Sequence, residues 1–451
     1  MSGWTTKKLG EVCTFRRGLT YSKGDEVEHS SKVVLRANNI SLEKNQLCFD
    51  ELKFIRDDFE IPDDKYLEKD CLLICTASGS KAHLGKVAYI DKEYDFAFGG
   101  FMGLIVPDVS LVFSRYFYYV LTAENYRQFI QRLTDGANIN NLKFSQLAEF
   151  DIPIPPLAEQ KRIVAKIDAA FEKIDRLKAN AEKNLANAKE LFQSALDEAM
   201  RPKKGWVEKR LGEVYDVRDG THDSPKYVAE GWPLVTSKNL RYGRVVLDEV
   251  KLISKSDYDA INARSKVDVG DVLMAMIGTI GNPVVVTEPP EYAIKNIALF
   301  KLKEGQHSKF LRYLLLSTRV TAKMANEASG SNQHFVGLKY LRNFLADFPP
   351  LDEQRQIVSR LDDLSQKLET LQQNYERQIA DCAEMRQAIL REAFEGRLCT
   401  REKGIPFALT EQGAPVPRKI GVAQGMWHFP EDWEEQDKAL DAEIAEDFYA
   451  D

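Results

Sequence analysis

The feature that most constrains this chain is a stretch that the sequence writes twice. PPLAEQKRIVAKID begins at Pro155, and PPLDEQRQIVSRLD begins at Pro349. The second copy lies 194 positions after the first, and identical residues recur at this offset as far as Ala199 and Ala393. A register kept without a gap over about 45 residues indicates an internal repeat. We therefore expect two halves with one architecture.

Each copy opens a long apolar stripe that predicts a helix. Apolar residues recur three and four positions apart, with no Pro or Gly from Leu157 to Met200 or from Leu351 to Glu395. The narrow stripe is typical of a coiled-coil seam, and each helix should be roughly 60 Å long. Two separate surface helices are the alternative, because Lys178 and Gln372 interrupt the heptads. The predicted packing residues are Leu157, Val164, Ile167, Ile174 and Leu177 in the first copy and Leu351, Val358, Leu361, Leu368 and Leu371 in the second.

The segments before the helices repeat more loosely. Each half opens with Gly-Trp and then LGEV, and LRANNI in the first half stands beside VTSKNL in the second. Strand-like and helical runs follow in both, which predicts mixed α/β globules. The loops differ, as two different ligands would require. The predicted segments are globules over 1–150 and 201–348, helices over 151–200 and 349–398, and an acidic tail over 399–451.

Length and composition set the class of protein. A chain of 451 residues is too long for one hydrophobic core, and its apolar runs are too short to span a bilayer. Six scattered cysteines do not form a disulfide framework, and the first residues lack the apolar region of a signal peptide. We expect a soluble protein of the cytoplasm.

The net charge of −7 is unevenly distributed. Residues 201–350 carry 23 Lys and Arg against 17 Asp and Glu, whereas residues 399–451 carry 5 against 12. The second globule can therefore offer a phosphate-binding surface while the acidic tail lowers the total. A tail that is merely solvated is the plainer alternative.

Catalytic and metal-binding motifs are incomplete. GSKAHLGKV, from Gly79 to Val87, has the wrong glycine spacing for a phosphate loop and lacks its Ser or Thr. Cys71 and Cys75 have no second pair with zinc-site spacing, so we expect buried thiols. TEPPEY and DFPPL lack the Asn of the Asn-Pro-Pro-aromatic tetrad of amino-group DNA methyltransferases, and no histidine accompanies a recognisable nucleophile. We predict no catalytic residue, no metal and no cofactor bound by this chain.

Polar clusters suited to reading double-stranded DNA remain. Arg and Lys pair with guanine or phosphate, and Asn and Gln pair with adenine, although an ordinary polar loop is the alternative for each residue. The candidates of the first half are Arg16, Arg17, Arg36, Asn38, Asn39, Ser78, Ser80, Lys81, Asn138, Asn140, Asn141 and Lys143. Those of the second half are Arg218, Thr221, His222, Thr236, Ser237, Lys238, Asn239, Arg241, Asn296, Ser331, Asn332, Gln333, His334 and Lys339.

With its doubled PPLxEQxxIV motif and its two LGEV openings, the sequence resembles the specificity subunit of type I restriction-modification systems, HsdS, over about residues 1–398. The resemblance implies two target recognition domains that read an interrupted, asymmetric DNA site, with two antiparallel helices as a spacer. It also implies a non-catalytic subunit that positions two methylation subunits, which use S-adenosylmethionine to methylate adenine. Two restriction subunits, which need ATP and Mg²⁺, would complete a complex that cleaves phage DNA.

Three alternatives to this resemblance stay open at the level of the sequence. A type IIB recognition subunit would differ only in its partner genes. A self-contained nuclease or methyltransferase would need the catalytic motifs that are missing. A coiled-coil adaptor that binds only protein would not need divergent loops or a basic second globule.

Overall fold

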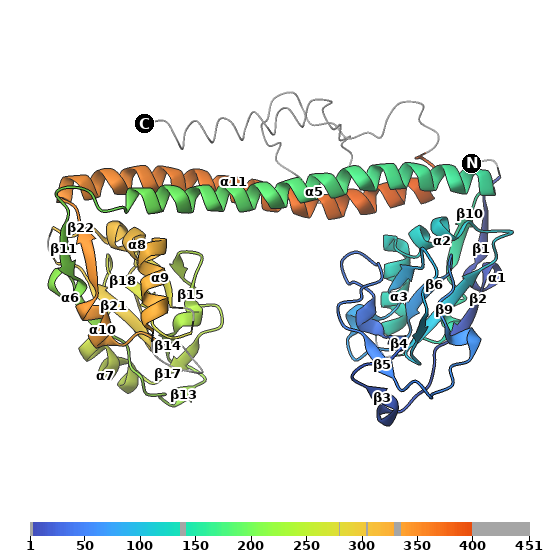
Figure 1. Ribbon diagram of the computed structural model, residues 1–451, viewed down its shortest axis with the longest axis horizontal. Coiled ribbons are helices and arrows are strands. Elements are labelled where there is room, and N and C mark those ends of the chain that lie inside the picture. The colour runs from blue at the N-terminus through green and yellow to red at the C-terminus, as the bar shows by residue number, and fades with distance from the viewer. Residues whose placement is uncertain (1–2, 136–140, 279, 304, 329–334, 399–451) are drawn as a thin grey trace. The chain divides into compact units, whose positions relative to one another are not determined.

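The computed structural model describes residues 3–135, 141–278, 280–303, 305–328 and 335–398 (Figure 1). Within these ranges the chain forms two compact units, one from residues 3–181 and 377–398 and the other from residues 182–376. The division passes through both long helices, α5 (Leu157–Ala199) and α11 (Leu351–Phe394). Each unit therefore consists of one globule and a segment of each helix.

The first unit contains two four-stranded sheets and one two-stranded sheet. The central sheet is antiparallel, in the order β2 (Cys13–Arg17), β9 (Met102–Pro107), β6 (Leu72–Cys75) and β7 (Val87–Tyr89). The second has the order β3 (Glu26–Val27), β5 (Lys53–Ile55), β4 (Lys32–Leu35) and β8 (Phe96–Phe98), with β4 and β8 parallel. β1 (Thr5–Lys8) pairs with β10 (Asp151–Ile154). β6 is wholly apolar and buried because cores lie on both of its faces.

Short helices cover the central sheet of the first unit. They are α1 (Leu9–Val12), α2 (Ser114–Val120), α3 (Glu124–Thr134) and α4 (Phe144–Leu147), with 3-10 turns η1 (Lys23–Asp25), η2 (Ala37–Asn39), η3 (Asp63–Lys65) and η4 (Lys81–His83). The LGEV motif forms α1, and its Leu9 and Val12 enter the core. Its Glu11 carboxylate accepts a hydrogen bond of 2.6 Å from the Lys8 backbone amide and caps the turn.

The second unit repeats this strand order. Its central sheet is β12 (Asp216–Asp219), β21 (Ile297–Lys301), β18 (Val272–Ala275) and β19 (Gly281–Val285). Its other sheets are β13 (Tyr227–Val228), β17 (Lys251–Ile253), β14 (Trp232–Val235) and β20 (Ala293–Ile294), and the pair β11 (Val207–Arg210) and β22 (Leu345–Phe348). The LGEV helix α6 (Leu211–Val214), turn η5 (Ser237–Asn239) and helices α8 (Ser308–Leu316), α9 (Thr318–Glu327) and α10 (Leu338–Asn343) also recur. The prediction of two mixed α/β globules is confirmed.

Two elements distinguish the second globule. α7 (Lys255–Ser265) lies between β17 and β18, whereas the described residues between β5 and β6 of the first globule have the turn η3 as their only helical element. A hairpin of β15 (Leu240–Arg241) and β16 (Arg244–Val245) follows η5. The corresponding segment of the first globule is a single bridge between Ile40 and Leu47.

The two long helices pack antiparallel inside each unit. In the first unit Ile163, Ile167 and Ile174 of α5 share a core with Cys382, Ile389 and Ala393 of α11. In the second unit Leu196 of α5 joins Ile357 and Leu361 of α11. Positions early in one helix thus meet positions late in the other, and each buried side chain contributes about 1.5–3 kcal/mol before entropic losses. Each globule rests on the helix that follows it and on the helix from the other half.

Most of the predicted packing residues face these cores. Val164, Ile167, Ile174, Val358 and Leu361 are buried in them, and Leu177 packs against the first. Leu157, Leu368 and Leu371 are half-buried outside these two cores. The prediction is wrong for Leu351, which is 42% exposed.

The first turn of each helix explains that error. In α11 Gln354 is buried, and its side-chain amide donates a hydrogen bond of 3.0 Å to the Pro349 carbonyl. In α5 Gln160 donates one of 2.8 Å to the Pro155 carbonyl. The Gln of the repeated motif, rather than its Leu, therefore holds the Pro-Pro segment against the first turn of each helix. Neither helix, nor any other in the described ranges, has an apolar run long enough to cross a membrane.

Candidate nucleic-acid interface

In the first unit four loop segments meet at one end of the central sheet. The Leu19 amide, just beyond β2, donates to the Phe98 carbonyl at 2.7 Å. The Thr76 and Ala77 amides, just beyond β6, both donate to the Phe101 carbonyl at 3.0 Å. The Leu142 amide donates to the Thr76 carbonyl at 2.7 Å and brings the segment before α4 to the same place. We call this region the loop end of the sheet.

The second unit builds its loop end in the same way. The Thr221 amide donates to the Ile294 carbonyl at 3.0 Å, and the Val336 amide donates to the Met276 carbonyl at 3.0 Å. The crossing requires glycine in both units. A Cβ on Gly18 would lie 2.0 Å from the Gly99 carbonyl oxygen, and one on Gly220 would lie 2.3 Å from that of Ile294. The shared framework is therefore backbone, which leaves the side chains free to differ.

Exposed polar side chains surround the loop end of the first unit. Arg17 is exposed, with its guanidinium carbon 5.7 Å from the centre of the Phe144 ring. Asn141 is also exposed and forms a β-bridge with Ala77. Arg16 is less available, because its guanidinium pairs with Glu68 at 2.6 Å. The remaining predicted residues that are exposed here are Asn38, Ser80, Lys81 and Lys143, whereas Arg36 and Ser78 are half-buried.

Asn39 and Asn239 do not belong to a DNA-reading surface. Both are buried in the equivalent turns η2 and η5. The Asn239 amide donates to the Val246 carbonyl at 3.0 Å, and its oxygen accepts from the Thr236 backbone amide at 2.9 Å. Asn39 likewise donates to the Cys48 carbonyl at 2.9 Å. Both amides are consumed by local backbone groups, so their prediction as base contacts is wrong.

Arg218 is half-buried and its charge is compensated. Its guanidinium pairs with Asp216 at 2.7 Å and donates to the Arg264 carbonyl at 3.1 Å. The hydrogen bond from Arg218 lowers the pKa of Asp216, which keeps this carboxylate ionised. A phosphate would have to compete with that carboxylate.

His222 lies in a small polar cluster at the loop end of the second unit. Its Nδ1 is 2.9 Å from the Asn296 side-chain oxygen, and its Nε2 is 2.9 Å from the Asp219 carboxylate. These two hydrogen bonds raise the pKa of His222. The imidazole therefore gains a positive charge more readily than a free histidine.

Other predicted residues of the second half divide by exposure. Lys238, Arg241 and Lys339 are exposed, and Thr221, Thr236, Ser237 and Asn296 are half-buried. Asn138, Asn140, Ser331, Asn332, Gln333 and His334 lie outside the described residues.

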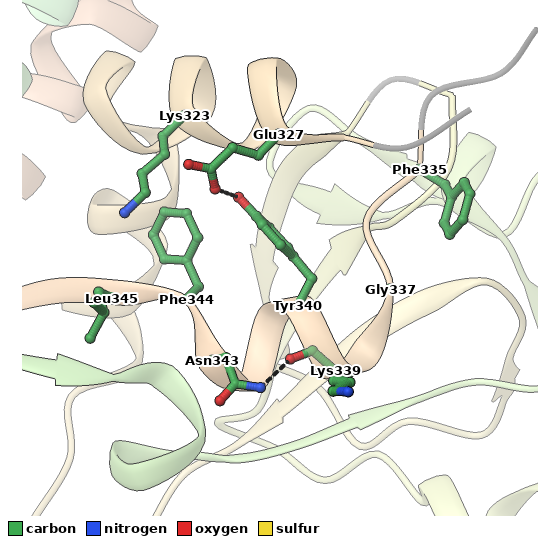
Figure 2. A pocket seen from close by; sticks show the side chains of 9 residues that line it. All are labelled: Lys323, Glu327, Phe335, Gly337, Lys339, Tyr340, Asn343, Phe344 and Leu345. Atoms are coloured by element: carbon green, nitrogen blue, oxygen red, sulfur yellow. Dashed lines mark hydrogen bonds between the residues drawn. The ribbon is translucent and has the colours of Figure 1, made fainter. Parts of the chain in front are cut away.

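Lys339 borders a pocket of about 590 Å³ between α9 and α10 (Figure 2). The Tyr340 hydroxyl donates to the Glu327 carboxylate there at 2.7 Å, and the Lys323 ammonium lies 4.8 Å from the centre of the Phe344 ring. At the offset of 194 positions the first unit has Phe129 in place of Lys323, with its ring tilted against that of Phe150 at a centre-to-centre distance of 5.1 Å. The lysine that borders this pocket is therefore replaced by an aromatic residue in the first unit.

Sequence reasoning missed two exposed aromatic residues. Phe101 is 71% exposed at the loop end of the first unit, and Tyr242 is 86% exposed in the turn of the β15–β16 hairpin. The sequence feature next to each residue is glycine, which is typical of a turn: Gly99-Gly100 precedes Phe101, and Gly243 follows Tyr242.

The described residues include no group of three or more His, Cys, Asp or Glu suited to a metal. Cys71 and Cys75 are buried, and burial raises the pKa of each thiol to about 12. They are packed thiols rather than ligands or nucleophiles.

Comparison with known proteins defines the class. The family model described as type I restriction modification DNA specificity domain matches residues 1–186 and again residues 203–379. The chain is thus a protein with two DNA specificity domains. It belongs to the family of type I restriction-modification specificity subunits, which recognise DNA sequence.

Relatives and solved structures agree. The chain is 27% identical over 420 residues to the type I restriction enzyme EcoKI specificity subunit of Escherichia coli K12, covering 88% of this chain and 89% of that one. It is 26% identical over 431 residues to the StySPI specificity subunit of Salmonella potsdam, with the same coverage. A chain from a structure on complex assembly of the type I R-M system superposes with a TM-score of 0.69 at 20% identity, covering 88% of this chain and 99% of that one. The HsdS subunit from Thermoanaerobacter tengcongensis gives a TM-score of 0.51 at 19% identity, covering 88% and 97%.

Proposed function

We propose that each globule is a target recognition domain that reads one half of an interrupted, asymmetric DNA site. The observation that carries the proposal is that both units present loops from one end of the same strand order while the side chains there differ. Arg17, Phe101 and Asn141 border the loop end of the first unit. His222 and Asn296 border that of the second. Equal frameworks with unequal side chains suit two different half-sites.

In this proposal the chain itself catalyses no reaction. The chain holds the DNA for two methylation subunits, which bring S-adenosylmethionine for methylation of adenine N6. Two restriction subunits, with ATP and Mg²⁺, join the complex that cleaves unmethylated DNA in the cytoplasm. The family membership and the specificity-subunit names of the relatives support this assignment.

Exchange of one globule tests whether each half reads its own half-site. Residues 1–150 are replaced by the corresponding segment of a related specificity subunit, and the methylated sites are mapped in the assembled complex. We expect a change in one half of the site only, because the other globule is untouched. The matched exchange of residues 201–348 should change the opposite half. A change in both halves from either exchange would contradict the proposal.

The antiparallel helices are proposed to set the gap between the half-sites. Adding four residues to one helix lengthens it by about 6 Å, close to two base-pair steps of about 3.4 Å each. Compensated insertions in α5 and α11 should therefore shift the preferred spacer by about two base pairs. Methylation of targets with altered spacers measures this, and activity confined to the original spacer would refute it.

A further inference from the structure

A pocket of about 340 Å³ lies between the β15–β16 hairpin and α8 of the second unit. It is lined by Arg241 and Tyr242 from the hairpin, Asn282 from β19 and Arg312 from α8. These residues are separate from the backbone hydrogen bonds that build the loop end of the sheet. We call it the arginine pocket.

The hairpin holds its turn in a defined geometry. Tyr242 and Gly243 have φ of +56° and +69°, the left-handed values that a tight two-residue hairpin turn requires. Arg241 and Arg244 are directly opposite each other in the register. Like charges at such a cross-strand pair are destabilising. Repulsion between these two arginines therefore lowers the stability of the hairpin, and a bound anion would reduce that repulsion.

Arg312 approaches the same turn from the opposite wall. Its guanidinium carbon lies 5.4 Å from the centre of the Tyr313 ring, and a Cβ on Gly243 would be 3.3 Å from its Nη2. In the described part of the chain no carboxylate forms an ion pair with Arg241, Arg244 or Arg312. Arg16 and Arg218 differ, because each has its own carboxylate. Arg241 and Arg312 thus bring to the pocket two guanidinium groups without a carboxylate partner among the described residues. Such groups favour a phosphate, whose oxygens match their planar fork.

The repeat supplies an internal comparison for the α8 wall. Tyr119 and Tyr313 are equivalent, since both donate to the aspartate of the repeated helix motif. Their preceding residues, Tyr118 and Arg312, are therefore equivalent too. In the first unit the Tyr118 hydroxyl donates to the Asn45 carbonyl at 3.1 Å and closes the gap between helix and turn. In the second unit an arginine stands in its place.

The β19 wall differs in the same manner. The Lys86 carbonyl accepts from the amide of Cys75, the last residue of β6, and Gly281 stands opposite Ala275, the last residue of β18, so Lys86 and Gly281 correspond. In the first unit the Lys86 ammonium donates to the Leu42 carbonyl. In the second unit Gly281 has no side chain at this place, and Asn282 beside it lines the pocket. Tyr118 and Lys86, which bond to carbonyls of the turn in the first unit, are thus replaced by Arg312 and Gly281 in the second.

The position of the pocket indicates which ligand it binds. The hairpin begins directly after η5, which carries the exposed Lys238, and Asn282 is the second residue of β19, close to the β18–β19 turn. Both walls therefore continue segments that flank the loop end of the sheet. We propose that the arginine pocket binds a backbone phosphate of DNA, with Arg241 and Arg312 as the pairing groups. This inference rests on the proposed function, and it adds a sequence-independent phosphate site to the second recognition domain.

The test uses the full chain assembled with its methylation subunits. The double variant Arg241→Gln and Arg312→Gln removes the pairing groups, while Arg241→Lys and Arg312→Lys keep the charges. Arg355→Gln, an exposed α11 arginine paired with Asp352, is the matched control for loss of charge. Affinity for target DNA is measured against salt concentration. The slope of log K against log salt should fall by about 0.9 for each phosphate that the glutamine variant no longer neutralises. It should stay unchanged in the lysine variant and the control.

Single methylphosphonate substitutions then locate the phosphate that the pocket binds. One neutral phosphate beside the second half-site should weaken binding by the wild type about tenfold and should not weaken the glutamine variant further. An unchanged slope, or equal sensitivity of both proteins to that substitution, would overturn the proposal. Inorganic phosphate could also compete with DNA for the pocket more strongly than chloride does at equal ionic strength. If it does so while no methylphosphonate position weakens binding, the pocket binds free phosphate and the proposal is overturned.

These outcomes are separable from failure of the proposed function. A wild-type complex that does not distinguish target from scrambled DNA would refute sequence reading itself. A glutamine variant that still prefers the target, with a reduced salt slope, supports the pocket. Equal melting temperatures of the glutamine and lysine variants would show that the change lies in binding rather than folding.

Discussion

Tyr313 of α8 donates a hydrogen bond of 2.8 Å to the carboxylate of Asp362 in α11. Asp362 belongs to the second copy of the repeated motif, and Asp168 of the first copy accepts the equivalent bond from Tyr119. Each aspartate also pairs with a cation that lies one helical turn before the tyrosine, Lys309 in the second unit and Arg115 in the first. The motif thus ties each globule to its long helix through the same polar contact.

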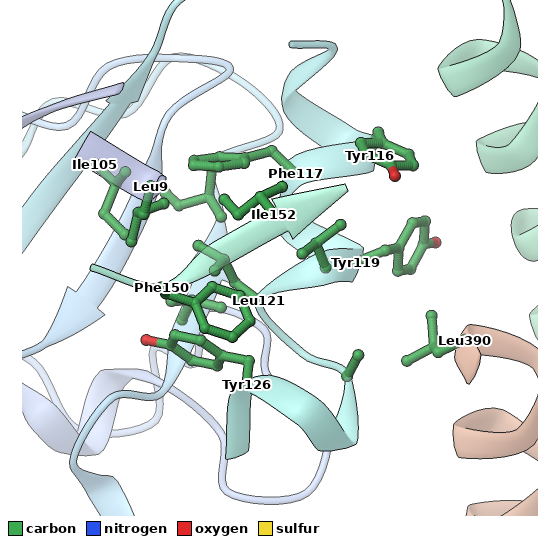
Figure 3. Packing of buried hydrophobic residues seen from close by; sticks show 14 of the residues in the cluster. Leu9, Ile105, Tyr116, Phe117, Tyr119, Leu121, Tyr126, Phe150, Ile152 and Leu390 are labelled. Atoms are coloured by element: carbon green, nitrogen blue, oxygen red, sulfur yellow. The ribbon is translucent and has the colours of Figure 1, made fainter. Parts of the chain in front are cut away.

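Removing this phenol should loosen one unit only. Tyr313→Phe removes the phenol donor and leaves Lys309 as the partner of the carboxylate, so it should cost about 1.5–3 kcal/mol, toward the lower end because Asp362 is partly exposed. Hydrogen exchange of α8 amides measures the loss of protection. Tyr119→Phe is the matched variant and should affect α2 in the first unit, where Tyr119 lies in the cluster that contains Leu390 (Figure 3). Equal loosening of both helices by either variant would argue against the pairing.

Asn239 should matter for stability and not for target choice. Asn239→Ala removes the donor to the Val246 carbonyl and should lower the free energy of unfolding by about 1–3 kcal/mol. The methylated sequence should stay the same, because the side chain is buried. Lys238→Ala at the neighbouring exposed position is the control, and it should leave the free energy of unfolding nearly unchanged. A changed target sequence in a stable Asn239→Ala variant would refute the structural role.

Salt dependence should separate two basic residues of the second unit. Lys238→Gln should reduce the slope of log K against log salt by about 0.9 if Lys238 contacts one phosphate. Arg218→Gln should change the slope much less, since Asp216 already compensates its charge. Titrations between about 50 and 200 mM salt measure both slopes. The reverse order of effects would show that Arg218 leaves its carboxylate on binding DNA.

Two histidines should titrate on opposite sides of the usual value. Hydrogen bonds to Asn296 and Asp219 raise the pKa of His222, whereas burial lowers that of His307. Stability from His222 is therefore present below about pH 6.5 and is lost as the pH rises through its folded-state pKa. The contribution of His307 to the free energy of unfolding has the opposite pH dependence. It is lost as the pH falls from about 6.5 through the lowered folded-state pKa, because the buried imidazole then has to take up a proton. NMR titration, with His222→Gln for assignment, measures both, and a single shared midpoint would contradict these environments.

The sequence by itself determined the repeat, the two long helices and the mixed α/β class. These features depend on local periodicity and on matching residues at one offset, so they can be read without knowing which side chains meet. The offset of 194 positions also relates Gln160 to Gln354 and Asp168 to Asp362, although the roles of these residues were not evident from it. The domain boundaries at residues 150 and 348 stay predictions.

Only the tertiary structure decided what the polar residues do. Asn39, Asn239 and Arg218 have the right chemistry for reading DNA, yet each is engaged by groups that fold against it. Tyr242 and Arg312 have no signature in the sequence, because their place at a pocket depends on a hairpin and a helix more than 60 positions apart. Burial and pairing arise from contacts through space, and a linear pattern of residue types does not contain those distances. Periodicity therefore sufficed to predict the repeat, the two long helices and the fold class, whereas packing decided which polar side chains are exposed on the surface.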